Sequence, residues 1–377
     1  MACTNCQCPV KPLPSKASIS LLLADPNGSA SFVFMARLAI IIFLLAQLAG
    51  LGCRSTPEPQ NLARCDFTSP HMGTLFKISL FAADNSLAKS AADAAFHRIA
   101  ELDNIMSDYQ ADSELMMLCD KPCGQPVAVS EDLFAVLRQA QKISDVSNGA
   151  FDITVGPYVR LWRFARKRKT LPTPEEIATA GKAVGFQKLR LNPADRTVTL
   201  LAPNMKLDLG GIAKGYAADQ ALKLLKARGF DRALVAASGD LAAGNPPPGK
   251  AGWRVGITDI DVRDDQVGRT VLLRNAGIST SGDTEQFVEI GGMRYSHIVD
   301  PHTGLGLTNR IQASIVARSS TTTDALATTI CVLGAERGLK LINKLSGTAA
   351  FVLEKKAGAE EQHFSKNWDA TVRVGAP

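Results

Sequence analysis

The stretch "KLRLNPADRTVTLLAPNMKLDLGGIAKGYAADQALKLLKARG", residues 188–229, decides the fold class. Its first part alternates apolar and polar residues around a turn, which predicts a hairpin over 188–201 and a short strand over 205–209. Apolar residues at helical spacing follow and predict a helix over 213–229 that ends at its glycine. Antiparallel strands next to a helix, without regular alternation of strand and helix, predict an α+β fold.

The rest of the chain fits this class. Strands are predicted over 74–82, over 287–299 as a pair around Gly291-Gly292, and over 311–317. Helices are predicted over 86–107, 130–149 and 324–345, and a short one begins in 173–177 with Thr173 as its cap. The first helix places on one face Leu87, Ala91, Ala95, Ile99, Leu102 and Met106. No internal repeat follows residue 65, so we expect one continuous folded unit.

Composition and charge limit which kinds of molecule the protein can bind. The chain has 377 residues, 46% of them hydrophobic, and a formal net charge of +6. Part of that charge lies in the run "RFARKRK" at 163–169, which is typical of a solvated face or of a site for phosphates or acidic lipids. No basic stripe interleaved with aromatic residues accompanies it, so we exclude nucleic acid as a partner.

An export segment is predicted at residues 1–53. The stretch "ARLAIIIFLLAQLAGLGC", 36–53, has the length of a signal-peptide apolar region and ends at a small-residue neighbourhood around Cys53. It fits a cleaved signal, a membrane-spanning anchor, or a lipoprotein signal with Cys53 as the lipidated residue. Residues 1–34 are unlike the start of such a signal, so Met35 is a candidate start. We expect a tether over 54–69 and the functional domain over 70–377.

The eight cysteines do not follow a zinc-binding pattern. Cys119 and Cys123 are spaced for a local disulfide in an oxidising compartment or for two free thiols. Cys331 lies in an apolar helical stretch and is expected in the core.

The stretch "DLGGIAKG", 208–215, lies between a strand and a helix. Its glycines let backbone groups approach a ligand, and Lys214 in the first helical turn suits a phosphate. The alternative is a tight turn with a solvent-facing lysine. The spacing matches neither common nucleotide-binding glycine motif.

The stretch "TTTDALATT", 321–329, separates Asp324 and Thr328 by four residues. On a helix their oxygens lie on one face about one turn apart. A hard cation such as Mg²⁺ takes such oxygen ligands. The alternative is that Asp324 supports a helix N-terminus while Thr328 bonds to a backbone carbonyl.

The stretch "SNGAFDITVGP", 147–157, places an aromatic ring beside a carboxylate at Phe151 and Asp152. This pair could hold a ligand ring and its polar edge. The alternative is that Phe151 belongs to the core.

The stretch "YSHIVDPHTG", 295–304, contains two of the five histidines of the chain. Histidine is suited to moving a proton near neutral pH, so His297 is the candidate for chemistry. Asp300 is expected to shape the turn before Pro301, and His302 to be an exposed loop residue without a role.

Taken together, seven stretches resemble the ApbE family, the FAD:protein FMN transferases, over residues 70–355. They are "MGTLF" (72–76), "MSDYQADSEL" (106–115), "GAFDITVGP" (149–157), "DLGGIAKGYAAD" (208–219), "SGDTEQF" (281–287), "YSHIVDPHTG" (295–304) and "TTTDALATT" (321–329). The resemblance implies an ApbE-like, T-fold-like arrangement of mixed sheets with packed helices. It also implies a bacterial protein exported to the periplasmic side of the inner membrane, often lipid-anchored.

The family's site residues carry over position by position. Its flavin contacts fall on Met72, Tyr109, Ala150, Phe151, Asp152, Asp208, Lys214 and Ile298. Its metal ligands fall on Gly211, through the backbone carbonyl, and on the side chains of Asp324 and Thr328. The chain departs from the pattern at Ala327, an acid in some members, and at Ser238, a glycine in many.

The resemblance implies a Mg²⁺-dependent reaction. Such enzymes cleave FAD, attach its FMN half by a phosphoester bond to a Ser or Thr of an acceptor protein, and release AMP. His297 is the candidate base for the acceptor hydroxyl. The chain lacks the family's acceptor motif, so its acceptor should be another protein. Two alternatives remain: hydrolysis of FAD to FMN and AMP, and a non-catalytic periplasmic flavin-binding lipoprotein.

Overall fold

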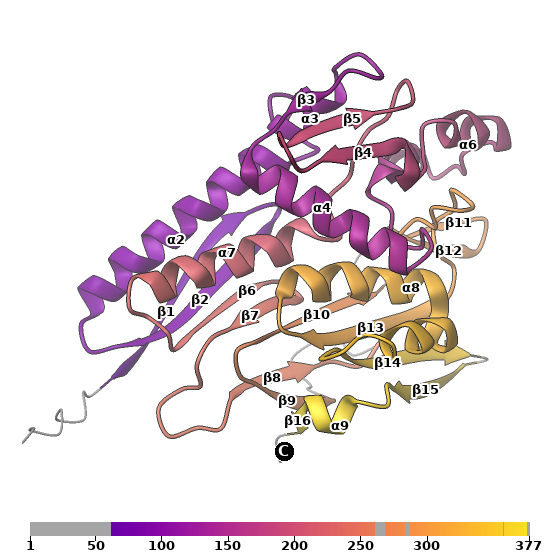
Figure 1. Cartoon of the computed structure of the whole chain (residues 1–377). Helices are drawn as coiled ribbons and strands as arrows, with labels where there is room; N and C mark the ends of the chain where they lie inside the picture. The colour runs from indigo at the N-terminus through magenta and orange to yellow at the C-terminus, as the bar shows by residue number, and fades with distance from the viewer. Residues whose placement is uncertain (1–61, 261–267, 283–286, 357, 375–377) are drawn as a thin grey trace, which may run out of the picture. The chain divides into compact units, whose positions relative to one another are not determined.

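The computed structural model describes residues 62–260, 268–282, 287–356 and 358–374 (Figure 1). The predicted export segment, residues 1–53, and the start of the tether lie outside the described residues. Strand β1 (Ala63–His71) begins the folded part before the expected boundary at residue 70. Within the described ranges, no helix has both the length and the apolar character that crossing a bilayer requires.

An eight-stranded sheet organises the fold, and every neighbouring pair in it is antiparallel. Its order is β1, β2 (Thr74–Ala82), β6 (Ala233–Ala237), β7 (Asp240–Ala243), β10 (Ala276–Gly282), β13 (Arg310–Ala317), β14 (Ala349–Lys356) and β15 (Ala359–Phe364). Antiparallel pairing without strand–helix–strand units confirms the predicted α+β class.

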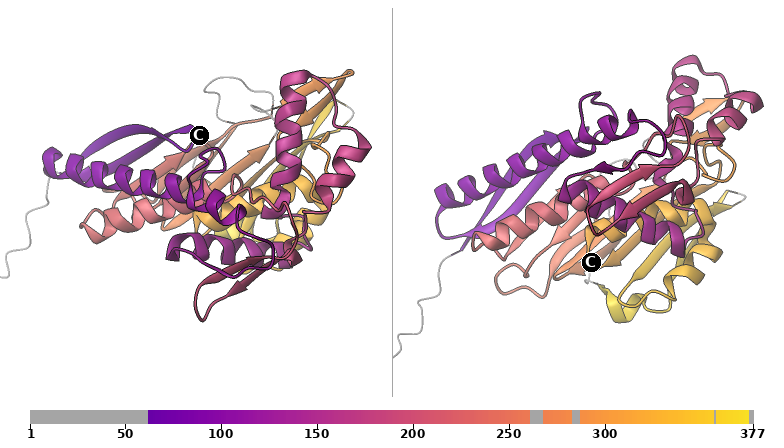
Figure 2. Two further views of the ribbon diagram at one scale, coloured as in Figure 1. Left: turned by 90° about the horizontal axis from the view of Figure 1, so that it is seen from above. Right: turned by 45° about the horizontal axis from the view of Figure 1, so that its top comes forward.

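Helices cover one face of this sheet (Figures 1 and 2). They are α2 (Asn85–Met106) over β1 and β2, α7 (Ala213–Ala227) over β6 and β7, and α8 (Ser320–Ile342) over β10, β13 and β14. Helix α4 (Glu131–Val146) packs on α2 and α8. The main core lies between the helices and the sheet and includes Cys331, as predicted.

A three-stranded sheet packs a second core against the opposite face. It comprises β8 (Trp253–Ile257), β9 (Arg269–Leu273) and β16 (Arg373–Val374), next to the short helix α9 (Trp368–Thr371). Trp253, Val271 and Trp368 bury their side chains there against Phe351 and Leu353 of β14. The large sheet is therefore apolar on both faces, which explains the continuous burial along β14.

The remaining elements are short helices, 3₁₀ turns and two small sheets outside the large sheet. They are α3 (Glu114–Cys119), α5 (Gly156–Arg168), α6 (Pro174–Gly181), the 3₁₀ turns Ile153–Val155 and Phe186–Lys188, the sheet of β3 (Val127–Ala128), β5 (Thr197–Leu200) and β4 (Leu189–Asn192), and the hairpin of β11 (Phe287–Ile290) and β12 (Met293–Ser296). The β4–β5 hairpin, the Gly291-Gly292 hairpin turn and the Thr173 capping box all match the predictions.

Three details correct the sequence reading, and the state of two cysteines decides between its alternatives. Residues 205–209 form no strand, because the Leu207 N–H donates to Cys119 Sγ at 3.3 Å and the Asp208 N–H to the Ile153 carbonyl at 2.8 Å. Leu87 is exposed in the first turn of α2 instead of facing the core. Cys119 and Cys123 are free thiols. Helix α8 begins at Ser320, four residues before the predicted start, and bends at Gly334.

Helices α7 and α8 cap each other. The Asp219 carboxylate on α7 accepts hydrogen bonds from the Ser320 N–H (2.9 Å), the Thr321 N–H (2.9 Å) and two hydroxyls at the start of α8. In return, Asp324 Oδ2 on α8 accepts a bond of 3.0 Å from the Gly215 N–H in the first turn of α7. A Cβ at residue 215 would lie 2.3 Å from the Ser320 carbonyl oxygen, so glycine is required at this crossing.

We predict that Asp219→Ala lowers the free energy of unfolding by about 2 kcal/mol or more, because it leaves several N-terminal donors of α8 unsatisfied. Urea unfolding measures this difference. Asp93→Ala is the control, since Asp93 makes an exposed ion pair with Lys89 and its loss should change stability by about 0.5 kcal/mol at most. Equal losses in the two variants would contradict the proposed capping role.

Candidate active site

One cavity of about 1580 Å³ collects the predicted site residues. Its wall comes from the β1–β2 turn, the end of α2, the loop after α4, helix α5, the start of α7, strands β7, β8, β10 and β13, and helix α8. All twelve predicted residues line it: Met72, Tyr109, Ala150, Phe151, Asp152, Asp208, Gly211, Lys214, His297, Ile298, Asp324 and Thr328. The fold thus brings positions 72 to 328 to one concave surface.

Lys214 does not face open solvent, which excludes the simple-turn alternative for its motif. Its ammonium lies 3.0 Å from Asp240 Oδ2, 3.7 Å from Asp324 Oδ2 and 3.2 Å from the Gly210 carbonyl oxygen. Burial lowers the pKa of Lys214, but the two carboxylates outweigh burial and raise its pKa above the ordinary value. Lys214 is therefore a fixed positive charge in the cavity wall.

Asp324 is almost fully buried, with 2% of its surface exposed. Burial, and next the like charge of Asp240, raise the pKa of Asp324 to about 7. Two buried carboxylates thus face a single lysine at this point of the wall. Such a site has an excess of negative charge that a bound cation would neutralise.

Thr328 and Gly211 complete an oxygen-rich corner beside Asp324. A Cβ at residue 211 would lie 3.1 Å from Thr328 Oγ1 and 3.3 Å from the Phe151 ring, so the glycine keeps this corner open. Thr328 Oγ1 also lies 3.4 Å from Ser281 Oγ. Carboxylate, hydroxyl and carbonyl oxygens are the donors that Mg²⁺ prefers, so these residues fit the predicted cation.

The alternative reading of this helix is partly correct. Asp324 does support a helix N-terminus, but that of α7 and not of its own helix. The bond from a threonine hydroxyl to a backbone carbonyl is made by Thr329, whose Oγ1 donates to the Ala325 carbonyl at 2.7 Å. Thr328 is left facing the cavity.

Tyr109 lies beside a cluster of charged side chains in the cavity wall, which is centred on Arg163. The Tyr109 side chain is exposed, and the Arg163 guanidinium stacks 4.0 Å from its ring centre. Arg163 also pairs with Asp108 at 2.6 Å and with Asp208 at 3.5 Å. Burial and the charge of Asp108 raise the pKa of Asp208. This cluster offers an aromatic face edged by a guanidinium and carboxylates.

Phe151 belongs to the core, as the alternative holds, since it is 4% exposed, and it also lines the cavity. Asp152 caps the following 3₁₀ turn, because its Oδ1 accepts from the Thr154 N–H and hydroxyl at 2.7 Å each. Met72 also lines the cavity, in a left-handed conformation with φ 48°, and its N–H donates to Asp103 at 2.9 Å. These residues are held by the backbone around them.

The two histidines of 295–304 differ in position. His297 is exposed and lines the cavity beside buried Ile298. It follows the end of β12 and is not part of a strand. Asp300 shapes the turn, since its Oδ1 accepts from the His302 N–H at 2.9 Å. His302 is exposed and is absent from the cavity wall, although its charge acts on the pKa of Asp152.

Sequence reasoning missed several wall residues. Arg163 and Arg166 belong to the basic run that predicts a solvated face or a site for phosphates or acidic lipids, and both line the cavity together with Val159. Their spacing of four and then three residues places all three on one side of α5, and this spacing was the available signal. Asp240 in "SGD" had no local signal, because only the fold brings it to Lys214.

These features define the class of protein: an α+β fold with an oxygen-rich corner beside a fixed lysine and an aromatic wall. The model of the ApbE family matches residues 72–352, so the chain belongs to the ApbE family. One relative named FAD:protein FMN transferase, from Salmonella typhimurium, is 31% identical, and the match covers 84% of this chain and 92% of the relative. Another of the same name, from Vibrio cholerae, is 30% identical, and the match covers 79% of this chain and 89% of the relative.

Solved structures agree with this assignment. The flavin transferase ApbE from Vibrio cholerae superposes with a TM-score of 0.74 at 28% identity, covering 82% of this chain and 99% of that one. The apo form of the flavinyl transferase ApbE from Pseudomonas stutzeri has a TM-score of 0.73 at 28% identity, with coverage of 82% and 97%. The predicted ApbE-like fold is confirmed.

The raised pKa of Asp324 predicts how stability depends on pH in metal-free solution. Between about pH 4 and 7 the folded state holds this proton while the unfolded chain does not. The free energy of unfolding should therefore fall as pH rises through that window. Asp324→Asn should remove this part of the slope, because the amide keeps the acceptor for Gly215 without the charge. Urea unfolding in EDTA at pH 5 and pH 7.5 measures the free energy of unfolding of both proteins. An equal change between the two pH values in wild type and Asp324→Asn would contradict the prediction.

Proposed function

We propose that this protein is a Mg²⁺-dependent FAD:protein FMN transferase. It would cleave FAD, attach FMN through a phosphoester bond to a Ser or Thr of an acceptor protein, and release AMP. The observation that carries the proposal is the convergence of all twelve predicted site residues on one cavity. The names of the relatives support the same reaction.

The cavity has room for the proposed substrates. At about 1580 Å³ it exceeds the roughly 300–1,000 Å³ of sites for single drug-sized ligands. A dinucleotide together with an acceptor segment needs such a volume. We place the flavin ring against Tyr109 and Phe151 and the diphosphate near Lys214, at the N-terminus of α7, where the ammonium and the positive end of the helix dipole favour phosphate.

Asp324, Thr328 and the Gly211 carbonyl would hold Mg²⁺ in the oxygen-rich corner. When bound, the ion spreads the negative charge of the diphosphate, which otherwise repels a nucleophile. Lys214 contributes fixed positive charge to the same end, and Asp240 holds its ammonium in place at 3.0 Å. Ala327 adds no ligand, since it is fully buried in the core.

The transfer itself needs a proton acceptor. The acceptor hydroxyl oxygen forms a bond to the FMN phosphorus, the bond from that phosphorus to the bridging oxygen breaks, and AMP leaves with the bridging oxygen. His297 takes the hydroxyl proton. Its exposed position at the cavity suits this role, because the acceptor protein must reach it from outside.

We further propose that the protein is exported and held on the periplasmic side of a bacterial inner membrane. The apolar stretch 36–53 with Cys53 at its end supports an anchor or a lipidated N-terminus. The chain's own "DVSNGAFD" and "LSGTAA" do not match an acceptor motif, so the acceptor is another protein. Because the enzyme is exported in this proposal, that acceptor is a protein of the cell envelope.

Incubation of the purified protein with FAD, Mg²⁺ and a Ser/Thr-bearing acceptor domain tests the proposal. We expect a flavin-fluorescent acceptor band in a gel and an equal amount of AMP, and both should be lost in EDTA. AMP without a labelled acceptor would indicate an FAD pyrophosphatase instead. Flavin binding without either product would indicate a binding protein.

We predict that His297→Gly lowers the rate of transfer by about a hundredfold or more while FAD still binds, because general base catalysis typically contributes roughly 10²–10⁴-fold. Single-turnover labelling measures the rate, and quenching of flavin fluorescence measures binding. His302→Gly is the matched control and should keep the wild-type rate, since His302 is absent from the cavity wall. Retained transfer in His297→Gly would remove His297 from the mechanism.

A further inference from the structure

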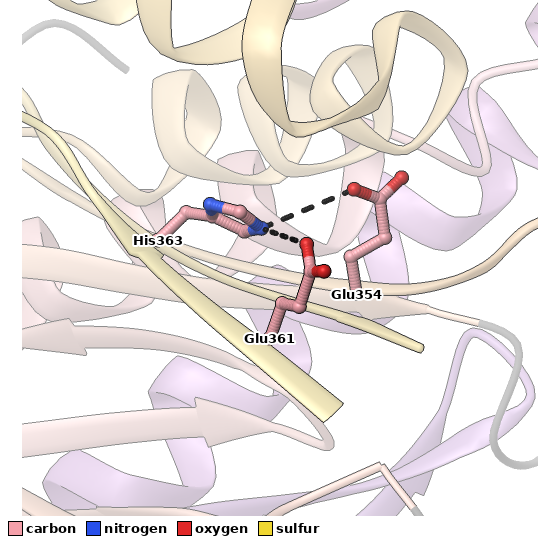
Figure 3. Close-up of side chains that lie close together, drawn as sticks. All are labelled: Glu354, Glu361 and His363. Atoms are coloured by element: carbon pink, nitrogen blue, oxygen red, sulfur yellow. Dashed lines mark ion pairs between the residues drawn. The ribbon is translucent and has the colours of Figure 1, made fainter. Parts of the chain in front are cut away.

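A second group of ligating side chains lies at the β15 edge of the large sheet. Glu354 is on β14, and Glu361 and His363 are on β15. The register pairs Glu354 directly with Glu361, and His363 follows two residues later on the same face of β15. Antiparallel pairing therefore places all three side chains on one face, as Figure 3 shows.

The three side chains point toward one another. His363 Nε2 lies 3.5 Å from Glu361 Oε2 and 4.0 Å from Glu354 Oε2, and one ligand atom from each residue lies within 4.8 Å of the others (Figure 3). His363 Nε2 is shielded from solvent, and no described residue forms a hydrogen bond with it. A buried ring nitrogen without a hydrogen bond, aimed at two carboxylates, is the arrangement of an unfilled ligand.

An exposed lysine, Lys356, pairs with both carboxylates. Lys356 Nζ lies 2.7 Å from Glu354 Oε2 and 3.8 Å from Glu361 Oε2, and 58% of its side chain is exposed. Glu354 by contrast is 9% exposed. An exposed ammonium can leave at low cost, whereas the buried carboxylate requires a positive partner.

We propose that Glu354, Glu361 and His363 form a binding site for a first-row divalent cation, best filled by Zn²⁺. One imidazole nitrogen and two carboxylate oxygens match the donors that zinc accepts, and the remaining position is open to water. Zinc bonds of about 2.0–2.1 Å bring ligand atoms to about 3.3 Å from one another. Glu354 Oε2 and His363 Nε2, which lie 4.0 Å apart, must therefore approach each other, and Lys356 must leave. The ion would tie edge strand β15 to β14.

Calorimetric titration of the full-length protein with Zn²⁺, in excess Mg²⁺ and without a histidine tag, tests the site. His363→Gln should weaken one equivalent of binding by more than about tenfold, since even outer-shell partners of metal ligands change affinity by roughly 10–100-fold. Glu360→Gln is the matched control, because Glu360 lies on the other face of β15, opposite Lys355. All variants keep the same cysteines, so thiol binding cancels in the comparison.

Lys356→Gln gives a test that a purely structural cluster would not pass. Removal of the competing ammonium should tighten Zn²⁺ binding, and Zn²⁺ should raise the melting temperature of the wild type and of Lys356→Gln but not of His363→Gln. Equal zinc affinity and equal thermal shifts in wild type and His363→Gln would overturn the proposal. So would binding by Ca²⁺ as tight as by Zn²⁺, because calcium favours oxygen ligands over imidazole.

Discussion

The crossing of α7 and α8 is the contact on which the cavity depends. Asp219 of α7 holds the start of α8, and Asp324 of α8 holds the start of α7. No side chain at Ile212 caps α7, so Asp324 supplies the group that α7 lacks, whereas Asp219 adds to the Ser319 cap that α8 already has. Gly215 lets the two backbones touch. The crossing fixes the distance between the glycine loop before α7 and the face of α8 that carries Thr328, and so fixes the oxygen-rich corner.

The same carboxylate therefore serves structure and binding. Asp324 Oδ2 caps α7 and lies 3.7 Å from Lys214, beside the second buried carboxylate of Asp240. Without a cation this arrangement is costly, because burial and like charge raise the pKa of Asp324. The stability cost and the affinity for a cation have one cause. A neutral residue at 324 would remove the stability cost, but it would also remove the affinity for a cation.

Local features of this fold could be predicted from sequence and nonlocal ones could not. The Thr173 capping box, the Gly291-Gly292 turn and the α2 stripe rest on neighbouring residues, and the structure has them, apart from Leu87 at the exposed start of α2. Residues 205–209 alternate like a strand, but their partners are Cys119 and Ile153, which no local pattern shows. Half of the twelve site residues stood out by local chemistry, such as His297 and the pair Asp324 and Thr328, and the other half came from family resemblance alone. Asp240 and Arg163 act through partners far away in the chain, which is why reading along the sequence missed them.

The departure from the family pattern at Ser238 illustrates how the fold tolerates change near the site. Ser238 has a left-handed backbone, φ 56°, which costs a residue other than glycine roughly 1–2 kcal/mol. Its neighbour Gly239 has no such freedom, because a Cβ there would lie 2.8 Å from the Thr280 carbonyl oxygen. A side chain at 238 strains one residue, whereas one at 239 would push β10 away from β7 and move Asp240 off Lys214. The position that must stay glycine is therefore 239, since it sets the carboxylate that holds the lysine.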